Sequence, residues 1–325
     1  MTEHATRTAV ISDLALELSR VTEEGAIAAV AYAGKGDKKM VDAAAVDAMR
    51  ARLQRMDIDG TVVIGEGEKD EAPMLYNGER VGRGGLEVDI AVDPIDGTTL
   101  LSKGLPGAIA VMALSGRGTM NVPIEVFYMD KIAVGPGAVG VVDINAPVAE
   151  NLKAVAKALG KSVPEVTVVI LDRPRHAQLI DDVRAAGGRV KLISDGDVAA
   201  GIQTALPESE IDVLMGVGGT PEGVIAAAAL RCTGGEIQCK PWPRDDEERQ
   251  KCLDAGLDLE HVYTTEELVG GNDVLFSATG ASSGEMLRGV RIHPGGAWTQ
   301  TVVMDALTGT IRWVEAGHNF KRLRA

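Results

Sequence analysis

Acidic side chains recur in the first half of this chain at short spacings that suit the binding of divalent cations. The strongest of these signals is the heptad Asp93-Pro94-Ile95-Asp96-Gly97-Thr98-Thr99, which follows an apolar run. Its two carboxylates return to the same side of an Asp-Pro turn, and the threonines can cap a helix whose first N–H groups face them. Two hard carboxylates beside a helix N-terminus suit Mg²⁺ or Mn²⁺ bound together with a phosphate. The alternative interpretation is an ordinary Asp-Pro turn followed by a helix cap.

Two more loops combine glycine with acidic residues. Gly65–Asp70 (GEGEKD) follows a predicted strand and could present Glu66 to a metal, or it could be a solvated acidic turn. A dinucleotide fingerprint is disfavoured there because Asp70 replaces the third glycine and the acidic side chains would repel a pyrophosphate. Gly218–Gly223 (GGTPEG) joins a strand to an apolar helix. A phosphate nest, a metal-binding Glu222 and a purely structural tight turn all remain open for this loop.

The second half of the chain carries two polar loops at the predicted carboxyl ends of parallel strands. Such strand ends are where open α/β sheets bind ligands. The two guanidinium groups of Asp172–His176 (DRPRH) match a phosphate by bidentate hydrogen bonds. The aspartates of Ser194–Asp197 (SDGD) could accept hydrogen bonds from sugar hydroxyls, although each loop taken alone could be an ordinary surface loop. We interpret His176 as a helix-start residue, because no serine or cysteine partner for nucleophilic catalysis is evident.

Hydrophobic periodicity predicts which elements position these loops. The first half reads as two helices followed by a sheet, at Ser12–Ala33, Asp42–Met56, Thr61–Ile64, Glu87–Asp93, Ala108–Leu114 and Phe127–Val134. After a helix near 149–159 the pattern becomes βαβαβ, which predicts a parallel sheet, with strands at Val166–Leu171, Val190–Ile193 and Ile211–Val217. We therefore predict an α/β protein with an α+β N-terminal lobe over residues 1–162 and a parallel-sheet C-terminal lobe over residues 163–325.

The composition excludes several classes of partner. The chain of 325 residues has a net charge of −14, which repels nucleic acid and anionic membrane surfaces. An acidic protein can hold a phosphorylated substrate only where local cations reverse the field, and bound divalent metals do so. The three cysteines show no C-x-x-C spacing and no signal peptide is readable, so we expect a cytoplasmic protein.

The longer motifs resemble a known family. Asp93–Thr98 resembles the signature of the lithium-sensitive, metal-dependent sugar and inositol phosphatases. The strings IGEGEKDEAPMLYNGE (Ile64–Glu79), DRPRH, SDGDVAA (Ser194–Ala200) and GGTPEGVIAAAA (Gly218–Ala229) are similar to those of the bacterial class II fructose-1,6-bisphosphatases. The likeness runs from about Leu14 to His318 and is weakest over Lys240–Tyr263.

The resemblance implies a layered α/β/α/β/α fold and hydrolysis of the 1-phosphate of fructose 1,6-bisphosphate with two or more Mg²⁺ or Mn²⁺ ions. The implied metal ligands are Asp42, Glu66, Asp93, Asp96 and Glu222. The implied substrate-binding residues are Asp96, Gly97, Thr98, Tyr128, Arg173, Pro174, Arg175, Asp195, Gly196, Asp197 and Gly219. Asp42, Glu66 and Thr98 are the implied catalytic residues, with Lys38 and Asp70 as second-rank candidates.

Several alternatives stay open at this point. Some relatives accept sedoheptulose 1,7-bisphosphate as well, and the motifs do not separate the two substrates. An inositol monophosphatase-like enzyme, a Rossmann-type oxidoreductase and a sugar-phosphate-binding module without catalysis are the other candidates. We expect a homo-oligomer, a dimer or a tetramer, with a small sugar bisphosphate as its ligand.

Overall fold

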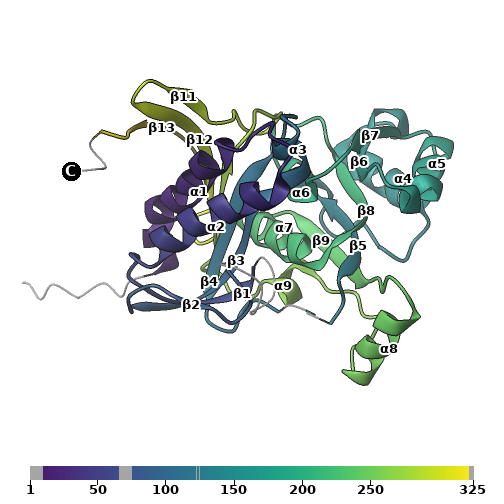
Figure 1. Cartoon of the computed structure of the whole chain (residues 1–325). Helices are drawn as coiled ribbons and strands as arrows, with labels where there is room; N and C mark the ends of the chain where they lie inside the picture. Colours follow the sequence, from purple (N-terminus) through teal and green to yellow (C-terminus); the bar gives the residue numbers. More distant parts are fainter. Residues whose placement is uncertain (1–9, 66–74, 122, 124, 322–325) are drawn as a thin grey trace, which may run out of the picture.

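The computed structural model describes residues 10–65, 75–121, 123 and 125–321, and its strands form two sheets (Figure 1). The α-helices are α1 (Ala15–Val30), α2 (Lys38–Leu53), α3 (Thr98–Ser102), α4 (Val148–Leu159), α5 (Ala177–Ala185), α6 (Asp197–Gln203), α7 (Thr220–Thr233), α8 (Asp246–Asp254) and α9 (Thr265–Leu268). The strands are β1 (Ile58–Ile64), β2 (Arg80–Val81), β3 (Leu86–Asp96), β4 (Ile109–Gly116), β5 (Tyr128–Val134), β6 (Thr167–Leu171), β7 (Arg189–Ile193), β8 (Val213–Gly219), β9 (Glu236–Pro241), β10 (Leu275–Gly280), β11 (Arg291–His293), β12 (Gly296–Asp305) and β13 (Thr310–Asn319). Short 3₁₀ helices occur at Ile11–Leu14, Pro136–Ala138, Val163–Glu165 and Pro174–His176.

The first sheet has the order β11-β12-β10-β4-β3-β1-β2, with β13 paired to β12. Strand β3 pairs with β1 in parallel and with β4 in the antiparallel sense, so it lies inside the sheet. Every residue of β10 is buried between β4 and β12. The end of β3, where Asp93 and Asp96 lie, is paired with β4, whereas the pairing of β3 with β1 stops at Ala91.

The second sheet has the order β7-β6-β8-β5-β9. The predicted βαβαβ unit is confirmed, because β7, β6 and β8 are parallel neighbours. Strands β5 and β9 extend this sheet in the antiparallel sense, so the sheet is mixed rather than wholly parallel. The carboxyl ends of β6 and β7 lead into loops that begin at Asp172 and Ser194, whereas β8 is followed directly by α7 at Thr220.

The predicted division of the chain between residues 162 and 163 does not follow the two sheets. Strand β5, from the first half, pairs in the second sheet, and β10 to β13, from the second half, pair in the first sheet. Period-2 alternation identifies a strand but not the neighbour with which it pairs. The lobe built on the second sheet is thus inserted between the parts of the chain that form the first.

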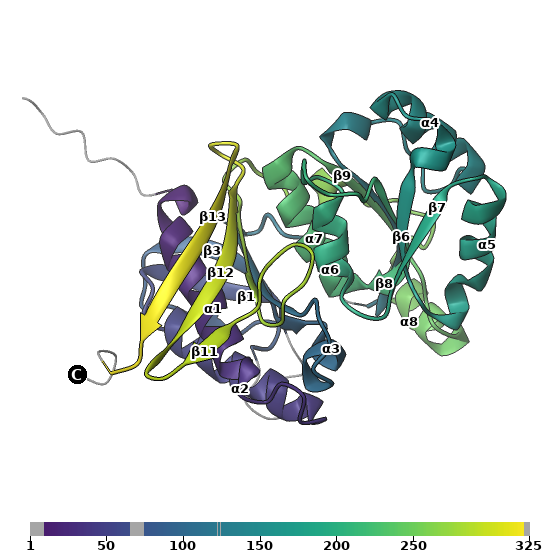
Figure 2. The ribbon, with the colours of Figure 1, turned by 90° about the horizontal axis from the view of Figure 1, so that it is seen from above.

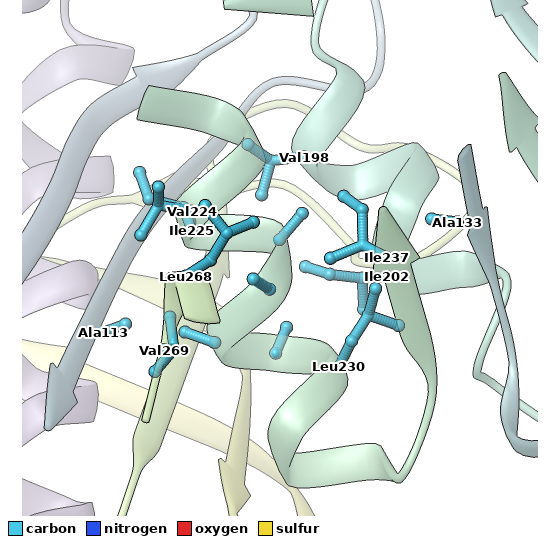
Figure 3. Packing of buried hydrophobic residues seen from close by; sticks show 14 of the residues in the cluster. Ala113, Ala133, Val198, Ile202, Val224, Ile225, Leu230, Ile237, Leu268 and Val269 are labelled. Atoms are coloured by element: carbon cyan, nitrogen blue, oxygen red, sulfur yellow. The ribbon is translucent and has the colours of Figure 1, made fainter. Parts of the chain in front are cut away.

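The elements stack as helix, sheet, helix, sheet, helix, as the predicted α/β/α/β/α fold requires (Figure 2). Helices α1 and α2 cover the outer face of the first sheet, and α4 and α5 cover the outer face of the second. Helix α7 lies between the sheets, where its Val224, Ile225 and Leu230 join one core with residues of α6, α9 and both sheets (Figure 3). A helix that is apolar nearly all round is stable only when it is covered on all sides.

Helix starts differ from the predicted ones by several residues. Ser12 does not cap α1: its N–H and hydroxyl bind Asp273 and Asp305, and α1 begins after a 3₁₀ turn. Helix α2 begins four residues before the predicted Asp42, because the Asp37 side chain caps it by accepting from the Met40 N–H. No helix within the described ranges has the length and apolar composition that crossing a bilayer requires.

Glu23 on α1 is a buried acid far from the polar loops, with 4% of its surface exposed. It lies beside Thr301 and 4.0 Å from His318 Nε2. Burial raises the pKa of Glu23 from 4.5 to about 7, against the opposing effect of Arg20. The folded protein therefore binds a proton that the unfolded chain releases between these two pH values, and its stability decreases as the pH rises through that range.

We expect Glu23→Gln to remove this pH dependence. As the pH rises from 4.5 to 8, the wild type should lose about 3 kcal/mol more free energy of unfolding than the variant does, because only the wild type has to ionise or keep protonated a buried Glu23. Urea unfolding at both pH values measures this difference. An identical difference at the two pH values would show that Glu23 stays ionised in the folded protein.

Candidate active site

A cavity of about 580 Å³ lies where the ends of β3, β6 and β8 approach one another. It brings together residues from α2, the β3–α3 turn and the loops of the second sheet. The residues singled out from the sequence that line it are Lys38, Asp42, Asp93, Asp96, Gly97, Thr98, Tyr128, Arg173, Arg175, Asp195, Gly196, Asp197, Gly219 and Glu222. Pro174 is not among its lining residues, while Glu66 and Asp70 lie outside the described residues.

The β3–α3 turn places Asp93 and Asp96 on the cavity wall. The sequence predicted a strand that ends at Asp93, before Pro94. Strand β3 instead continues to Asp96 through an irregularity, in which Asp93 pairs with Val111 and Asp96 with Ile109. Bulges of this kind admit proline and change the direction in which a side chain points. The Ile95 N–H donates to Asp93 Oδ1 at 3.0 Å, which fixes that carboxylate.

Gly97 makes the turn from β3 into α3 possible. Its φ of +84° lies in the left-handed region, where a side chain would be strained. Gly97, and not a threonine, therefore occupies the N-cap position of the five-residue helix α3. Thr98 is freed for another role. Its Oγ1 lies 2.9 Å from both Asp42 Oδ1 and the Ile95 carbonyl oxygen, and its single proton can serve one acceptor at a time.

Asp96 is a strongly perturbed acid in the cavity. Burial raises the pKa of Asp96 well above its ordinary value, and the charges of Asp197, Glu222 and Asp195 raise it further. The Ala199 N–H, 3.4 Å from Asp96 Oδ2, opposes this shift. Carboxylates that repel one another in a buried cavity need a cation to remain ionised together.

These oxygen donors fit a hard divalent cation, because Mg²⁺ and Mn²⁺ prefer carboxylate ligands. Burial and the neighbouring carboxylates both raise the pKa of Asp96, and a bound cation would offset this effect. Among the described residues, no three acid, imidazole or thiol groups already stand together as a closed metal site. The candidate ligand Glu66 follows Gly65, which does line the cavity.

Two arginines lie in the loop that follows β6 of the second sheet. Arg173 donates to the Ser194 carbonyl oxygen at 2.6 Å and to Asp195 Oδ1 at 3.3 Å. Arg175 donates to the Val217 carbonyl oxygen at 2.8 Å, and its guanidinium lies 4.9 Å from the centre of the Tyr128 ring. Stacking and backbone hydrogen bonds hold a guanidinium in one orientation, as recognition of a planar or tetrahedral anion requires.

The turn at Gly218 and Gly219 leaves room for two carboxylates. A Cβ added to Gly219 would lie 2.0 Å from Glu222 Oε2, and one added to Gly218 would lie 2.0 Å from Asp197 Oδ2. Pro221 occupies the first turn of α7, as its sequence position predicts. The glycines of this loop thus serve the close approach of side chains.

Several cavity features were not predicted from the sequence. Asn77 and Phe127 also line the cavity, and Thr99, expected from the sequence only as a possible helix cap, donates its N–H to Asp195 Oδ2 at 3.3 Å. Phe127 directly precedes Tyr128, and its backbone N–H donates to the buried Glu248 of α8 at 2.9 Å. One charged residue of α8 therefore holds the cavity wall, although α8 itself does not line the cavity.

His176 precedes α5, as predicted for a helix-start residue, but it also joins two strands. Its Nδ1–H donates to the Leu171 carbonyl oxygen at 2.7 Å, while Nε2 accepts from the Val217 N–H at 2.8 Å. This pattern requires the neutral ring. Burial lowers the pKa of His176, and the charge of Arg175 lowers it further. The backbone of Val217 is thus bound on both sides: His176 accepts from its N–H, and Arg175 donates to its carbonyl oxygen.

Comparison with known proteins identifies relatives over nearly the whole chain. Residues 12–318 match the family model described as bacterial fructose-1,6-bisphosphatase, glpX-encoded. The fructose-1,6-bisphosphatase 1 class 2 of Escherichia coli K12 is 45% identical, with 95% of this chain and 96% of the relative covered. The fructose-1,6-bisphosphatase class 2 of Shigella flexneri matches with the same identity and coverage. A solved structure described as an extragenic suppressor from Pyrococcus furiosus covers 59% of this chain at 14% identity, with a TM-score of 0.30.

We expect His176→Phe to destabilise the second lobe. The phenyl ring keeps the shape but leaves the Val217 N–H without the acceptor that His176 supplies, and the Leu171 carbonyl keeps only the Arg173 N–H as a donor. The loss should amount to about 2–4 kcal/mol of the free energy of unfolding at pH 8. Because the pKa of His176 is lowered, its contribution should decrease as the pH falls below about 6.5.

Thermal and urea unfolding measure the effect, with the exposed His293→Phe as the matched control. Equal stability of the two variants would show that His176 does not bridge the strands.

Proposed function

Since this chain belongs to the bacterial class 2 fructose-1,6-bisphosphatases, we propose that it hydrolyses the 1-phosphate of fructose 1,6-bisphosphate at the cavity between the sheets, giving fructose 6-phosphate and inorganic phosphate. One observation carries the assignment of the site: an acidic half, with Asp93, Asp96 and Glu222, and a half with two arginines line the same cavity. The volume of about 580 Å³ lies in the usual range of small-ligand sites, about 300–1,000 Å³. A ligand with a phosphate at each end suits such a division.

The family acts with metals, and we assign the acidic half of the cavity to them. The ligands would be Asp42, Glu66, Asp93, Asp96 and Glu222, and the preferred ions Mg²⁺ or Mn²⁺. When bound, such ions supply a water of lowered pKa and offset the charge of the reacting phosphate. The crowding of Asp96 by neighbouring carboxylates supports this assignment.

Thr98 is our candidate for orienting the attacking water. When its proton is donated to Asp42, a lone pair of the same oxygen stays available to accept a hydrogen bond from water. In this arrangement Asp42 accepts the hydrogen bond from the Thr98 hydroxyl. The N–H groups at Gly97 and Thr98 lie beside Asp96, where the scissile phosphate would sit.

The other half of the cavity would fix the substrate. We assign Arg173 and Arg175 to the non-reacting phosphate, with Pro174 stiffening the loop between them. Tyr128 and Gly219 are register partners on adjacent strands and would contact the sugar, as would the loop Asp195–Asp197. Binding the distal end in one position removes the entropic cost of aligning the reacting phosphate.

We also propose a cytoplasmic location and a homo-oligomeric assembly. The three cysteines are buried and form no disulfide, as expected in a reducing compartment. Within the described residues, β13 pairs with β12 alone, and Trp298 and Trp313 on these strands are about half exposed. An open edge beside exposed aromatic residues favours contact with a second copy of the chain.

Exhaustive chelation should abolish phosphate release from fructose 1,6-bisphosphate, and added Mn²⁺ or Mg²⁺ should restore it.

Asp93→Asn and Glu222→Gln should each lower kcat by at least about a hundredfold because they remove charged metal ligands. The exposed Glu208→Gln is the control and should keep wild-type kcat. Full turnover by metal-free wild type would refute the metal assignment, and normal kcat of Glu222→Gln would remove that residue from the site.

Arg175→Ala should lower kcat/KM for fructose 1,6-bisphosphate about tenfold to a hundredfold, because a charge-assisted hydrogen bond contributes about 1.5–3 kcal/mol. Hydrolysis of fructose 1-phosphate, which lacks the distal phosphate, should be almost unaffected. Arg244→Ala is the matched control, since Arg244 also lies over an aromatic ring, Phe127, but does not line the cavity. An equal loss on both substrates would place Arg175 at the reacting phosphate instead.

A further inference from the structure

Lys131 is a buried cation directly behind the cavity wall. It lies on β5 with 2% of its surface exposed, and of the lysines and arginines in the described ranges it alone is buried. Its ammonium donates to Asp197 Oδ2 at 2.9 Å. Asp197 lines the cavity, whereas Lys131 does not. Lys131 can therefore act on the site only through its neighbours.

The surrounding backbone is shaped to admit this ion pair. A Cβ on Gly218 would lie 2.9 Å from Lys131 Nζ and 2.0 Å from Asp197 Oδ2, so any side chain there would displace both partners. A Cβ on Gly223, in the first turn of α7, would lie 3.4 Å from Lys131 Cε. The lysine side chain thus reaches from the second sheet, past the β8–α7 turn, to the first residue of α6.

The charge around Asp197 shows what this pair accomplishes. Asp197 is 9% exposed and shares the cavity with Asp96, Asp195 and Glu222, all of which carry negative charge when ionised. A buried ion pair is costly to form compared with apolar packing, so stability alone is a weak reason for one. Here it neutralises one carboxylate from the protein side and holds that carboxylate by one oxygen at a fixed place.

We propose that Lys131 is a positioning residue for the hydrolysis: its ion pair holds the Asp197 carboxylate in an orientation in which Asp197 can accept a hydrogen bond from a sugar hydroxyl. Without Lys131, the Asp197 carboxylate is an additional uncompensated charge in a cavity that must admit two phosphates. This inference rests on the proposed function, in which Asp197 contacts the substrate. Its expected signature is weaker substrate binding rather than slower chemistry.

Steady-state kinetics on Lys131→Met, Asp197→Asn and the double variant test the proposal with metal-saturated protein. We expect Lys131→Met to raise KM for fructose 1,6-bisphosphate at least tenfold while kcat changes less than threefold. We expect Asp197→Asn to raise KM comparably. In the double variant, KM should stay within about twofold of that of Asp197→Asn, because Lys131 acts through Asp197.

Lys161→Met is the matched control. Lys161 Nζ pairs with the buried Asp212 at 2.5 Å in the same lobe, outside the cavity. This variant should lose stability without any change in KM. A purely structural role for Lys131 would likewise lower the melting temperature and the active fraction but leave KM unchanged, and that result would overturn the proposal.

If Lys131→Met alone does not fold, the KM values of Asp197→Asn and of the double variant test the proposal. Both of these variants lack the carboxylate at position 197, so neither leaves a buried carboxylate without its lysine. A KM of the double variant more than about tenfold above that of Asp197→Asn would overturn the proposal, as would an unchanged KM for Asp197→Asn. Failure of the wild type to release phosphate would instead refute the proposed function, so the two failures are distinguishable.

Discussion

Repulsion between carboxylates crowded into one cavity is the constraint around which the site is organised. Asp96 is buried and faces the charges of Asp197 and Glu222, and both burial and these charges raise its pKa. Placing these groups together lowers the stability of the folded protein, because burying each charge costs free energy unless an opposite charge or hydrogen bonds compensate it. Compensation comes from two sides: Lys131 neutralises Asp197 from within the protein, and the open side of the cavity suits divalent cations.

Holding such a site together requires two sheets that cannot move independently. Helix α7 fills the space between them, and the core around it contains residues of both sheets as well as α6 and α9 (Figure 3). Its first turn carries Glu222 into the cavity. The same helix therefore fixes the distance between the β3–α3 turn and the arginine loop. The apolar sequence of α7 follows from this central position.

The parts of the site that could be predicted from the sequence are those specified locally. The Asp93 heptad, the Arg173–Arg175 loop and the Asp195–Asp197 loop each follow an apolar strand, and the structure places all three on one cavity. Strand order is not local, so the entry of β10 into the centre of the first sheet could not be read from periodicity. Pro94 was likewise misjudged, because a bulge allows a proline within a strand.

Residues that act from behind the cavity wall are the hardest to identify from the sequence. Lys131 and His176 are close in the sequence to residues that the motifs single out, Tyr128 and Arg175. The roles of Lys131 and His176 themselves depend on the partners that other elements of the second lobe place beside them. Alternation along β5 indicates that Lys131 and Met129 share a face, but not that this face meets Asp197 and the Gly218 turn. Likewise, the two ring nitrogens of His176 find partners on β6 and β8 only because these strands are parallel neighbours. Arg175 donates to the carbonyl oxygen of Val217, the same residue whose N–H His176 binds, so its orientation depends on β8 as well as on its own loop.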